Sequence, residues 1–431
     1  MRFLLIDPDG DALDVALRSK QCGNDVKLFI RDEPRTCHVG IGLVDVVREF
    51  RPWLEWADLI FMAGNTKYLR EIDTFRELRP KALVVGPTQE TAAWELDRNR
   101  GFEICKKHGI AVPPYKQFTD YDAAIAYVKK EDCRLVSKPF GGTEDKSLTY
   151  AAGGVEPVKD MIFQLEKWKK QKKLKGPFIL QKFIDGIEMA ADAYVGPHGF
   201  DLGYSESFEF KKLMSGNFGM NTGEMGTVLR FTRRSKLANI VLKPLEEELV
   251  KQKYCGYASV NTIIDKKGQP HFLEFTMRPG WPTQNIYEAV HSDQDPCSRL
   301  YQLASGTDCC SVIIDKIAIG VVVALPSFPH SHTLAKEIDG LPIFGLTNRL
   351  WPHVHLCQAR MENGQIETAG DYVCVITAAA NTVSQARQAA YARVKSLDIP
   401  GGVAVRDDIG ERLSKQLPEL QKHGFASGLT Y

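Results

Sequence analysis

The sequence lacks any apolar run that approaches the roughly 18 residues of a membrane-spanning helix. Its first segment, MRFLLIDPDG, turns acidic at Asp7, which indicates a first strand and not a signal peptide. The ten cysteines have no CxxC spacing, and the adjacent pair Cys309 and Cys310 does not match a metal-binding pattern. Free thiols in a reducing compartment are the expected state. We therefore predict a cytoplasmic protein with no membrane partner.

An excess of either charge is also absent. The chain has 55 lysines and arginines against 54 aspartates and glutamates, a net charge of +1. This balance argues against a general nucleic-acid-binding protein, although it does not exclude one local basic site. The run KWKKQKKLK at 167–175 is the candidate for such a site. A solvated helix end is the preferred interpretation of this run, and contact with a polyanion is the alternative.

The common nucleotide-binding fingerprints GxxxxGK[ST] and GxGxxG are missing as well. The sequence has no convincing Ser/His/Asp or Cys/His set that would indicate a nucleophilic side chain. Chemistry that needs either of these patterns is therefore not expected.

The patterns that are present predict several domains, because 431 residues are too many for one compact core. Short apolar segments alternate with helical ones over about 1–98, which predicts a doubly wound parallel sheet. The residues from Gln89 to His108 are predicted as one helix. A small α+β unit follows at about 118–185, and then a strand-rich region with the loop MSGNFGMNTGEMG. We predict an α/β and α+β multidomain protein with domains at 1–98, 99–325 and 326–431.

Two segments of the small unit could bind a nucleotide. Lys138 ends an apolar strand and precedes PFGGTEDK, where two glycines let backbone N–H groups approach phosphates and Lys146 adds charge. A structural turn with surface lysines fits this segment about as well. The strand FILQKFI, from Phe178, then offers backbone groups to an adenine edge, and Glu188 could hold ribose hydroxyls. A hairpin with an exposed glutamate would have the same sequence pattern.

The third segment, HFLEFTMRPG at 271–280, places polar residues at alternate positions of an apolar strand. Glu274, Thr276 and Arg278 are predicted on one face, with Phe275 and Met277 on the other. A carboxylate on a buried strand is costly unless it is paired or binds a metal. Glu274 and Thr276 could present oxygens to Mg²⁺. Without other context, an internal Glu274–Arg278 ion pair is the favoured interpretation.

The order of these three segments resembles the ATP-grasp superfamily. Within it, the chain resembles phosphoribosylamine–glycine ligases (glycinamide ribonucleotide synthetases) over nearly its full length. The segments that carry the likeness are GPTQETAAWELDRNRGFEICKKHGIAVPPYKQF, FKKLMSGNFGMNTGEMG, FLEFTMRPGWPTQ and AYARVKSLDIPGGVAVRDDIGERL. The resemblance implies an ATP-grasp fold with an N-terminal parallel-sheet domain, a mobile lid at about 118–185 and a C-terminal α+β domain.

The resemblance also implies roles for individual residues, with ATP and Mg²⁺ as cofactors. Residues implied to contact ATP are Arg100, Lys138, Lys146, Gln181, Lys182, Phe183, Ile184 and Glu188. Glu274 and Thr276 are implied as metal ligands, and residues implied around the acyl phosphate and the amino acid are Lys211, Asn221, Thr222, Gly223 and Arg278. Arg406, Asp408 and Arg412 match a C-terminal motif for which domain packing and a substrate role are equally good interpretations.

Departures from the family pattern lie mostly at the acceptor half. Thr276 stands where the family has an asparagine, Glu224 stands where it has a glycine and could complete the metal site, and Asp371 stands where an arginine is usual. The turn DPDGDALD lacks the paired glycines and the arginine that the family uses around phosphoribosylamine. The ATP half therefore matches the family better than the acceptor half.

Three functions follow from these departures. The preferred one is an ATP-dependent carboxylate–amine ligase that activates glycine or a similar amino acid and joins it to another amine, such as a nucleotide or a modified base. The alternatives are ordinary phosphoribosylamine–glycine ligation in purine synthesis and a non-catalytic ATP-binding regulator, which Thr276 motivates. The sequence leaves open whether the protein is a monomer or a dimer.

Overall fold

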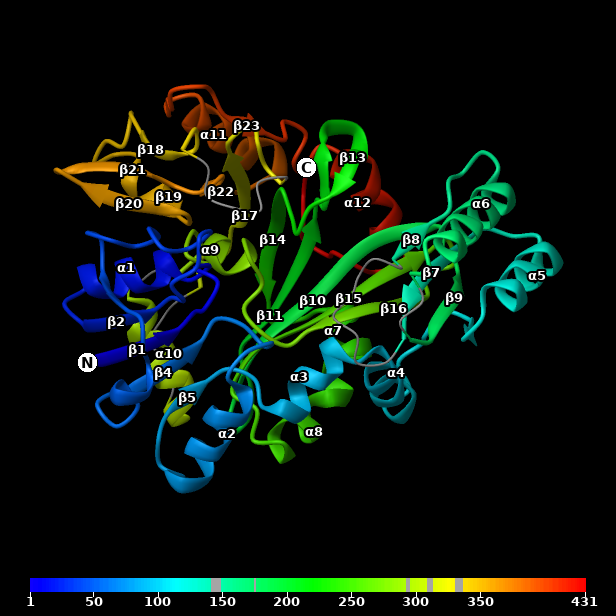
Figure 1. Cartoon of the computed structure of the whole chain (residues 1–431), viewed down its shortest axis with the longest axis horizontal. Coiled ribbons are helices and arrows are strands. Elements are labelled where there is room, and N and C mark those ends of the chain that lie inside the picture. The colour runs from blue at the N-terminus through cyan, green and yellow to red at the C-terminus, as the bar shows by residue number, and fades with distance from the viewer. Residues whose placement is uncertain (141–148, 174–175, 292–294, 308–312, 330–335) are drawn as a thin grey trace. The chain divides into compact units, whose positions relative to one another are not determined.

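The computed structural model describes residues 1–140, 149–173, 176–291, 295–307, 313–329 and 336–431 (Figure 1). The chain forms two compact units. The first contains Met1–Gln89, Met189–Ser259 and Thr276–Tyr431, and the second contains Glu90–Glu188 and Val260–Phe275. Each unit gathers separate segments, whereas the predicted domain ranges are contiguous, so those ranges stay a prediction. No helix in the described part of the chain is long and apolar enough to cross a membrane.

The N-terminal part of the first unit is a five-stranded parallel sheet in the order β3–β2–β1–β4–β5. This strand order confirms the predicted doubly wound architecture. Its elements are β1 (Arg2–Ile6), α1 (Leu13–Gln21), β2 (Asp25–Phe29), β3 (Asp45–Val47), η1 (Arg51–Trp53), β4 (Leu59–Met62), α2 (Leu69–Leu78) and β5 (Val84–Val85). The strands are short and largely apolar, and Leu4 and Ile60 belong to the same buried cluster as Ile72 of α2.

A large, mainly antiparallel sheet follows in the order β16–β15–β10–β11–β14–β17–β22–β19, with β23 beside β17. Its strands are β10 (Gly186–Gly196), β11 (Gly199–Glu209), β14 (Gly226–Thr232), β15 (Gly256–Asp265), β16 (Pro270–Thr276), β17 (Ile317–Ala324), β19 (Val354–Leu356), β22 (Tyr372–Ala380) and β23 (Ala404–Val405). Strands β10 and β15 each run from one compact unit into the other.

Helices and two small sheets complete the first unit. The helices are α7 (Lys236–Val241), η4 (Lys243–Leu245), α8 (Glu246–Lys251), α9 (Thr283–Tyr287), α10 (Pro296–Ser305), η5 (Trp351–His353), α11 (Val383–Val394) and α12 (Leu413–Lys422). The small sheets are β18 (Asp339–Pro342) with β20 (Ala359–Glu362) and β21 (Gln365–Ala369), and the hairpin of β12 (Lys212–Met214) and β13 (Phe218–Asn221) around η3 (Ser215–Asn217). The predicted loop MSGNFGMNTGEMG is therefore a hairpin over much of its length.

A buried charged network joins α1 to β19 and β22 within the first unit. Asp14 and Arg18 form an ion pair of 2.9 Å along α1. Asp14 also bonds to His355 at 2.8 Å, and Arg18 donates to the backbone oxygen of Val354 at 3.0 Å. His355 is fully buried and contacts Thr377 through its second ring nitrogen. The pKa of Asp14 is lowered because the charges of Arg18 and His355 outweigh the cost of burial.

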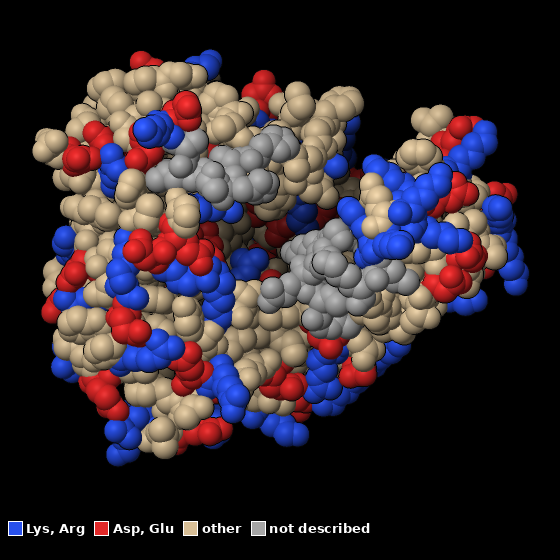
Figure 2. All heavy atoms as spheres, in the orientation of Figure 1, with Lys and Arg blue, Asp and Glu red and all other residues tan. Residues whose placement is uncertain are grey.

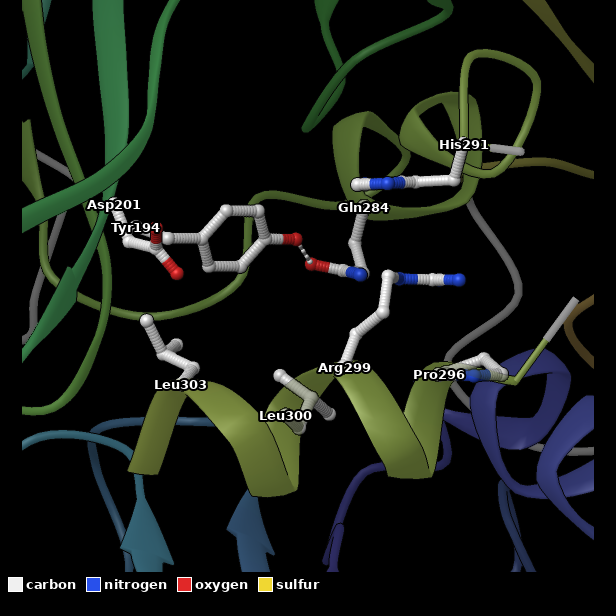
Figure 3. Close-up of a pocket in the computed structure, with 8 residues that line it drawn as sticks. All are labelled: Tyr194, Asp201, Gln284, His291, Pro296, Arg299, Leu300 and Leu303. Atoms are coloured by element: carbon white, nitrogen blue, oxygen red, sulfur yellow. Dashed lines mark hydrogen bonds between the residues drawn. The ribbon is translucent and has the colours of Figure 1, made fainter. Parts of the chain in front are cut away.

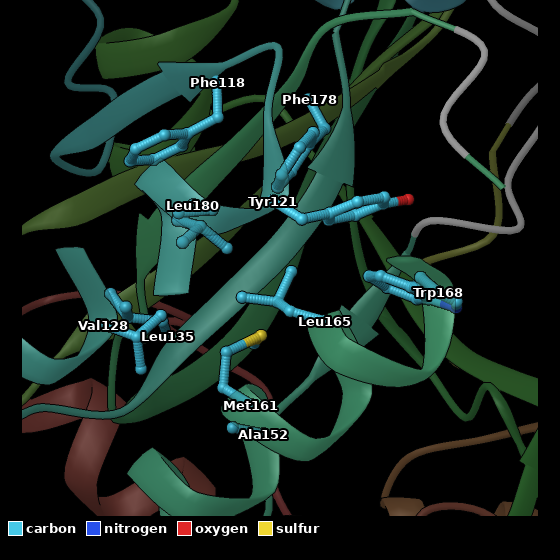
Figure 4. Packing of buried hydrophobic residues seen from close by; sticks show 11 residues of the cluster. Phe118, Tyr121, Val128, Leu135, Ala152, Met161, Leu165, Trp168, Phe178 and Leu180 are labelled. Carbon is cyan, nitrogen blue, oxygen red and sulfur yellow. The ribbon is translucent and has the colours of Figure 1, made fainter. Parts of the chain in front are cut away.

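The second unit contains a four-stranded sheet in the order β6–β9–β7–β8, covered on one face by two helices (Figure 4). The elements are β6 (Tyr115–Phe118), α5 (Tyr121–Glu131), β7 (Leu135–Pro139), β8 (Tyr150–Ala151), α6 (Pro157–Lys170) and β9 (Phe178–Lys182). Leu165 and Trp168 of α6 pack on Phe178 and Leu180 of β9. This part, called here the four-stranded subdomain (115–182), has the α+β content predicted for the small unit.

The predicted single helix from Gln89 to His108 is wrong in one respect, because the structure divides it. Helix α3 spans Gln89–Leu96 and α4 spans Arg98–Lys107. Asp97 lies between them in an extended conformation, and its carboxylate accepts a hydrogen bond from the backbone N–H of Asn99 at 2.9 Å. This is N-terminal capping, which starts a new helix at that residue.

Candidate active site

The strand register puts Lys138 and Gln181 on the same face of the four-stranded sheet. Lys138 pairs with Ile179, and Gln181 pairs with Val136 and Tyr115, so these residues alternate with those that face the helices. Lys138 and Gln181 are both buried, with 8% and 3% of their surfaces exposed. A buried lysine beside a strand end is suited to a phosphate, whose charge offsets the cost of burying the ammonium group.

The predicted adenine hinge continues from that strand. The amide nitrogen of Gln181 is buried and has no hydrogen-bond partner within the described residues. Lys182 is exposed, and its Nζ lies 3.6 Å from Oε2 of Glu131. The backbone N–H of Lys182 donates to the backbone oxygen of Pro114, and that of Phe183 donates to the backbone oxygen of Arg134. The Arg134 guanidinium lies over the Phe183 ring, 3.5 Å from its centroid. A fixed hinge backbone next to an unsatisfied buried amide fits a site for a heterocycle with hydrogen-bonding groups.

Three other residues are predicted to contact ATP, namely Ile184, Glu188 and Lys146. Ile184 is the last residue of the hinge and is half-buried. Glu188 lies near the start of β10 and is half-buried. The first residue of this strand is Gly186, which lies close to the backbone of Ile264. A Cβ atom at position 186 would be only 2.2 Å from the backbone oxygen of Ile264, so a residue without a side chain is needed there. Lys146 lies outside the described residues.

The strand that carries Glu274 follows the prediction only in part. β16 ends at Thr276, so Arg278 lies in the loop after it and not on the strand. Glu274 and Thr276 are half-buried, whereas Phe275 is buried and its ring lies 5.7 Å from that of Trp94. The aromatic contacts hold one side of the strand and leave the carboxylate and hydroxyl on a partly open side.

Arg98 is a residue that the sequence argument missed. Its Nε donates to the backbone oxygen of Pro139 at 3.0 Å, directly after Lys138. Burial lowers the pKa of Arg98, and the charge of Glu274 acts in the opposite direction. Arg100, which was predicted instead, forms ion pairs with Glu90 and Glu103. The break at Asp97 starts α4, whose first turn carries both arginines, and a search for caps in DRNRG could have found it.

The predicted amino-acid region lies on the segment 209–226 of the first unit. Nζ of Lys211 lies 3.1 Å from Oε2 of Glu209. The backbone oxygen of Lys211 accepts hydrogen bonds from the N–H and the hydroxyl of Thr222, at 2.8 and 3.1 Å. Asn221 and Gly223 are exposed, and Glu224 is buried. The segment therefore presents a lysine, an amide and a hydroxyl around one backbone junction.

The turn after β1 is acidic and close to Arg278. The Asp7 carboxylate accepts hydrogen bonds from the N–H groups of Gly10 and Ala12, at 3.0 and 2.7 Å. Burial and the charge of Asp11 raise the pKa of Asp7 to about 8. The pKa of Asp11 is also raised by desolvation, and Arg278 opposes this rise through its charge. The turn is thus filled by its own carboxylate at the start of α1.

A buried group of hydroxyls surrounds Asp192 at the centre of the first unit. Its carboxylate accepts a hydrogen bond from Ser259 at 2.5 Å and lies 3.5 Å from the hydroxyl of Tyr287. Burial raises the pKa of Asp192 to about 6, although the bonds from Ser259 and Ser207 act against it. No sequence pattern pointed to this residue, because its partners come from separate strands and a helix.

A small cavity lies beside α10 in the same unit (Figure 3). Its volume of about 20 Å³ has room for about one water molecule. The lining includes Tyr194, which donates to Gln284 at 2.8 Å, and Arg299, which pairs with Glu288. The predicted site residues do not line it. We assign this cavity to packing and not to substrate binding.

The basic run at 167–175 lies at the end of α6 in the part that the structure describes. Lys169 pairs with Asp122 of α5 at 2.6 Å, while Lys167, Lys170 and Lys172 are exposed. Lysine and arginine side chains gather on this part of the surface (Figure 2). A solvated helix end accounts for the arrangement, and the polyanion contact stays a prediction.

No group of three or more His, Cys, Asp or Glu side chains suited to a metal ion exists among the residues that the structure places. The oxygens of Glu274 and Thr276 nevertheless fit Mg²⁺, which commonly takes one or two protein ligands and fills its other positions with substrate phosphates and water.

The chain is similar in sequence to known proteins. Sequence models of the phosphoribosylglycinamide synthetase ATP-grasp (A) domain and C domain match residues 100–284 and 318–412, more than half of the chain together. A phosphoribosylamine–glycine ligase from Vibrio parahaemolyticus is 27% identical over 96% of this chain and 98% of its own. One from Salmonella typhimurium is 26% identical over 88% and 89%.

The fold comparison agrees with this result. The crystal structure of phosphoribosylamine–glycine ligase from Thermotoga maritima matches with a TM-score of 0.71 at 20% identity, covering 95% of this chain and all of that one. This confirms the predicted ATP-grasp fold. The chain belongs to the phosphoribosylglycinamide synthetase family of ATP-grasp enzymes, which are ADP-forming carbon–nitrogen ligases.

Proposed function

We propose that this enzyme joins glycine to phosphoribosylamine and converts ATP to ADP and phosphate. The observation that carries the proposal is the likeness to ligases of that name over nearly the whole chain, with both family domains in order. This supports the second of the three sequence hypotheses better than the preferred one. The non-catalytic alternative is not retained, because the family consists of ligases.

The proposed reaction has two steps. A carboxylate oxygen of glycine attacks the γ-phosphorus of ATP, the bond from that phosphorus to the β–γ bridging oxygen breaks, and ADP leaves. The amine nitrogen of the acceptor then attacks the acyl carbon, the amide bond forms, and phosphate leaves while the nitrogen gives up a proton. Both steps develop charge on phosphoryl or acyl oxygens, so cationic side chains and hydrogen-bond donors can accelerate them.

The residues have distinct proposed roles. Lys138 and Arg98 would bind ATP phosphates, and the hinge at Gln181 to Ile184 would bind adenine. Lys211, Asn221, Thr222, Gly223 and Arg278 would bind the carboxylate that becomes the acyl phosphate. Mg²⁺, held by Glu274 with help from Thr276, would neutralise phosphate charge.

Replacing Glu274 tests the metal assignment. Glu274→Gln keeps the size of the side chain and one acceptor oxygen but removes the charge that binds Mg²⁺. We expect turnover at saturating ATP and glycine to fall about 100-fold or more, in line with the loss of one transition-state charge contact. ADP release measured across a magnesium titration is the readout. Asp185→Asn, at an exposed ion pair with Lys266, is the matched control. Equal magnesium dependence in wild type and Glu274→Gln would refute the assignment.

A second candidate function has a different amine as the acceptor, and one observation favours it. Backbone N–H groups at a helix start commonly bind phosphate. Here the Asp7 carboxylate occupies those of Gly10 and Ala12, and Asp9 and Asp11 add negative charge to the turn. An acceptor without a phosphate at this position would fit the turn better than phosphoribosylamine does.

A single experiment separates the two candidates. ADP release is measured with ATP, glycine and either phosphoribosylamine or a panel of amines, including amino sugars without phosphate and nucleosides with a free amine. Turnover that depends on phosphoribosylamine supports the first function. Turnover with a phosphate-free amine and none with phosphoribosylamine supports the second. The cytoplasmic location stays a prediction.

A further inference from the structure

The hairpin at 212–221 has little that would hold it in place by apolar packing. The exposed fractions of Met214, Phe218 and Met220 are 56%, 71% and 44%. Its strands pair at Lys212 with Asn221 and at Met214 with Phe218, with an irregularity between them. Because an isolated two-stranded hairpin is marginally stable in water, its order must come from other contacts.

Those contacts come from Arg406, which directly follows β23. The Arg406 guanidinium donates to the backbone oxygen of Lys212 at 2.9 Å and to Oδ1 of Asn217 at 2.7 Å. Only 1% of its side chain is exposed. One buried planar group therefore bonds both to the first strand and to the turn of the hairpin, which the five fixed donors of arginine allow.

The next two residues add contacts to the same turn. Asp408 bonds to Arg406 and accepts a hydrogen bond from the N–H of Gly216 at 2.9 Å. Asp407 bonds to Ser215. The Tyr391 hydroxyl of α11 donates to the backbone oxygen of Arg406 at 2.7 Å, which fixes the backbone at Arg406. We call 406–408 the hairpin clamp.

The clamp acts on the residues proposed to bind the carboxylate. Lys211 precedes the hairpin, and Asn221 ends it; the two strand ends are joined where Thr222 bonds to the backbone oxygen of Lys211. Arg412 fixes the base of the segment by donating to the backbone oxygen of Glu209 at 2.5 Å. Displacement of the hairpin would therefore displace these side chains together.

We propose that Arg406 is a positioning residue for the ligation: it holds the hairpin at 212–221 so that Lys211, Asn221 and Thr222 meet the substrate carboxylate. The inference rests on the proposed function for its catalytic consequence. The clamp also accounts for the family motif in VRDDIGER, for which packing and substrate binding were equal interpretations. Arg406 bonds to the hairpin and needs no contact with the substrate.

The test combines proteolysis with kinetics in three variants. Arg406→Lys keeps the charge but cannot reach two acceptors, Asn217→Ala removes one acceptor, and Asn217→Asp keeps it. Trypsin cleavage after Lys211 and Lys212, followed by mass spectrometry, should be about tenfold faster in the first two variants and near wild type in the third, because the hairpin opens locally. This readout needs no substrate.

Kinetics then measure the effect on catalysis. We expect kcat/KM for glycine to fall about 10- to 100-fold in Arg406→Lys and Asn217→Ala, with KM for ATP changed by no more than about twofold, as for a misplaced contact at the reacting groups. Asn217→Asp should restore both values. Arg393→Lys, which loses a bond from α11 to the backbone oxygen of Thr377, is the control for a general loss of stability.

The outcomes separate the two proposals. Wild-type enzyme that fails to turn over with glycine and phosphoribosylamine contradicts the proposed function, while the trypsin comparison still supports or overturns the clamp. Unchanged cleavage in Arg406→Lys and Asn217→Ala overturns the clamp. Faster cleavage with kinetic changes no larger than those of Arg393→Lys overturns the positioning role.

Discussion

Arg98 and Arg100 lie two positions apart on α4 and have different surroundings. Arg98 donates to the backbone oxygen of Pro139, next to Lys138, and interacts electrostatically with Glu274. Arg100 instead forms ion pairs with Glu90 and Glu103. The resemblance to the family pointed to Arg100 by its position in the family pattern. The structure makes Arg98 the better candidate for a phosphate contact, because its charge has no close ion pair in the described residues.

Replacing each arginine distinguishes these two assignments. Arg98→Ala should raise the dissociation constant for ATP about tenfold, the effect of one charge-assisted hydrogen bond. Arg100→Ala should change it by less than about twofold, since exposed ion pairs contribute little. Nucleotide titration by calorimetry measures both constants. The reverse order of effects would restore Arg100 as the phosphate residue.

Helix α4 shows how one side chain determines an element boundary. Asp97 caps the helix, and the capped start orients the first turn, which carries both Arg98 and Arg100. Sequence reasoning identified helical content here because the apolar spacing continues through the break. It missed the break because aspartate occurs in exposed helix positions as well as at caps, and only the extended backbone at Asp97 distinguishes the two.

Removing the cap has a predictable cost. Asp97→Ala should lower the free energy of unfolding by about 1 kcal/mol, with Asp97→Asn near wild type because it keeps an acceptor oxygen. Denaturant unfolding followed by circular dichroism measures this difference. A loss in Asp97→Asn equal to that in Asp97→Ala would mean that charge, and not capping, stabilises the helix.

How far the sequence predicts this protein depends on how local each feature is. The parallel sheet, the four-stranded subdomain and the segment around Glu274 follow from patterns of a few consecutive residues. The large sheet brings together segments that are far apart in the sequence. Asp192 lies 67 positions from Ser259 and 95 from Tyr287, so this group could not be foreseen from spacing. The same holds for Arg406 with Asn217. Family likeness supplied some site residues, but it could not reveal where this chain makes contacts of its own.

The buried Asp192 makes the stability of the whole protein depend on pH. Its pKa is about 6 in the folded protein, above the ordinary value of 3.8, so the folded state retains a proton that the unfolded state has already lost. This contribution is present below about pH 4 and is lost as the pH rises through 6. The shift of roughly two units corresponds to about 3 kcal/mol.

Asp192→Asn should remove this dependence. Between pH 4 and 7, the free energy of unfolding should fall by about 3 kcal/mol more in wild type than in Asp192→Asn. Parallel denaturant titrations at several pH values measure the difference, with Asp185→Asn as a control for loss of an exposed carboxylate. Parallel curves for wild type and Asp192→Asn would show that Asp192 is ionised in the folded state at pH 4.

The ion pair of Asp14 and Arg18 has a consequence for the order of synthesis. Both residues belong to α1, yet they become buried against His355 and Val354, which follow more than 300 positions later. Until then, the nascent helix keeps two charges that favour water over an apolar contact. The N-terminal sheet can therefore form early, but its final docking must await the synthesis of Val354 and His355. A product that ends before these residues should therefore remain a target for chaperones and proteases.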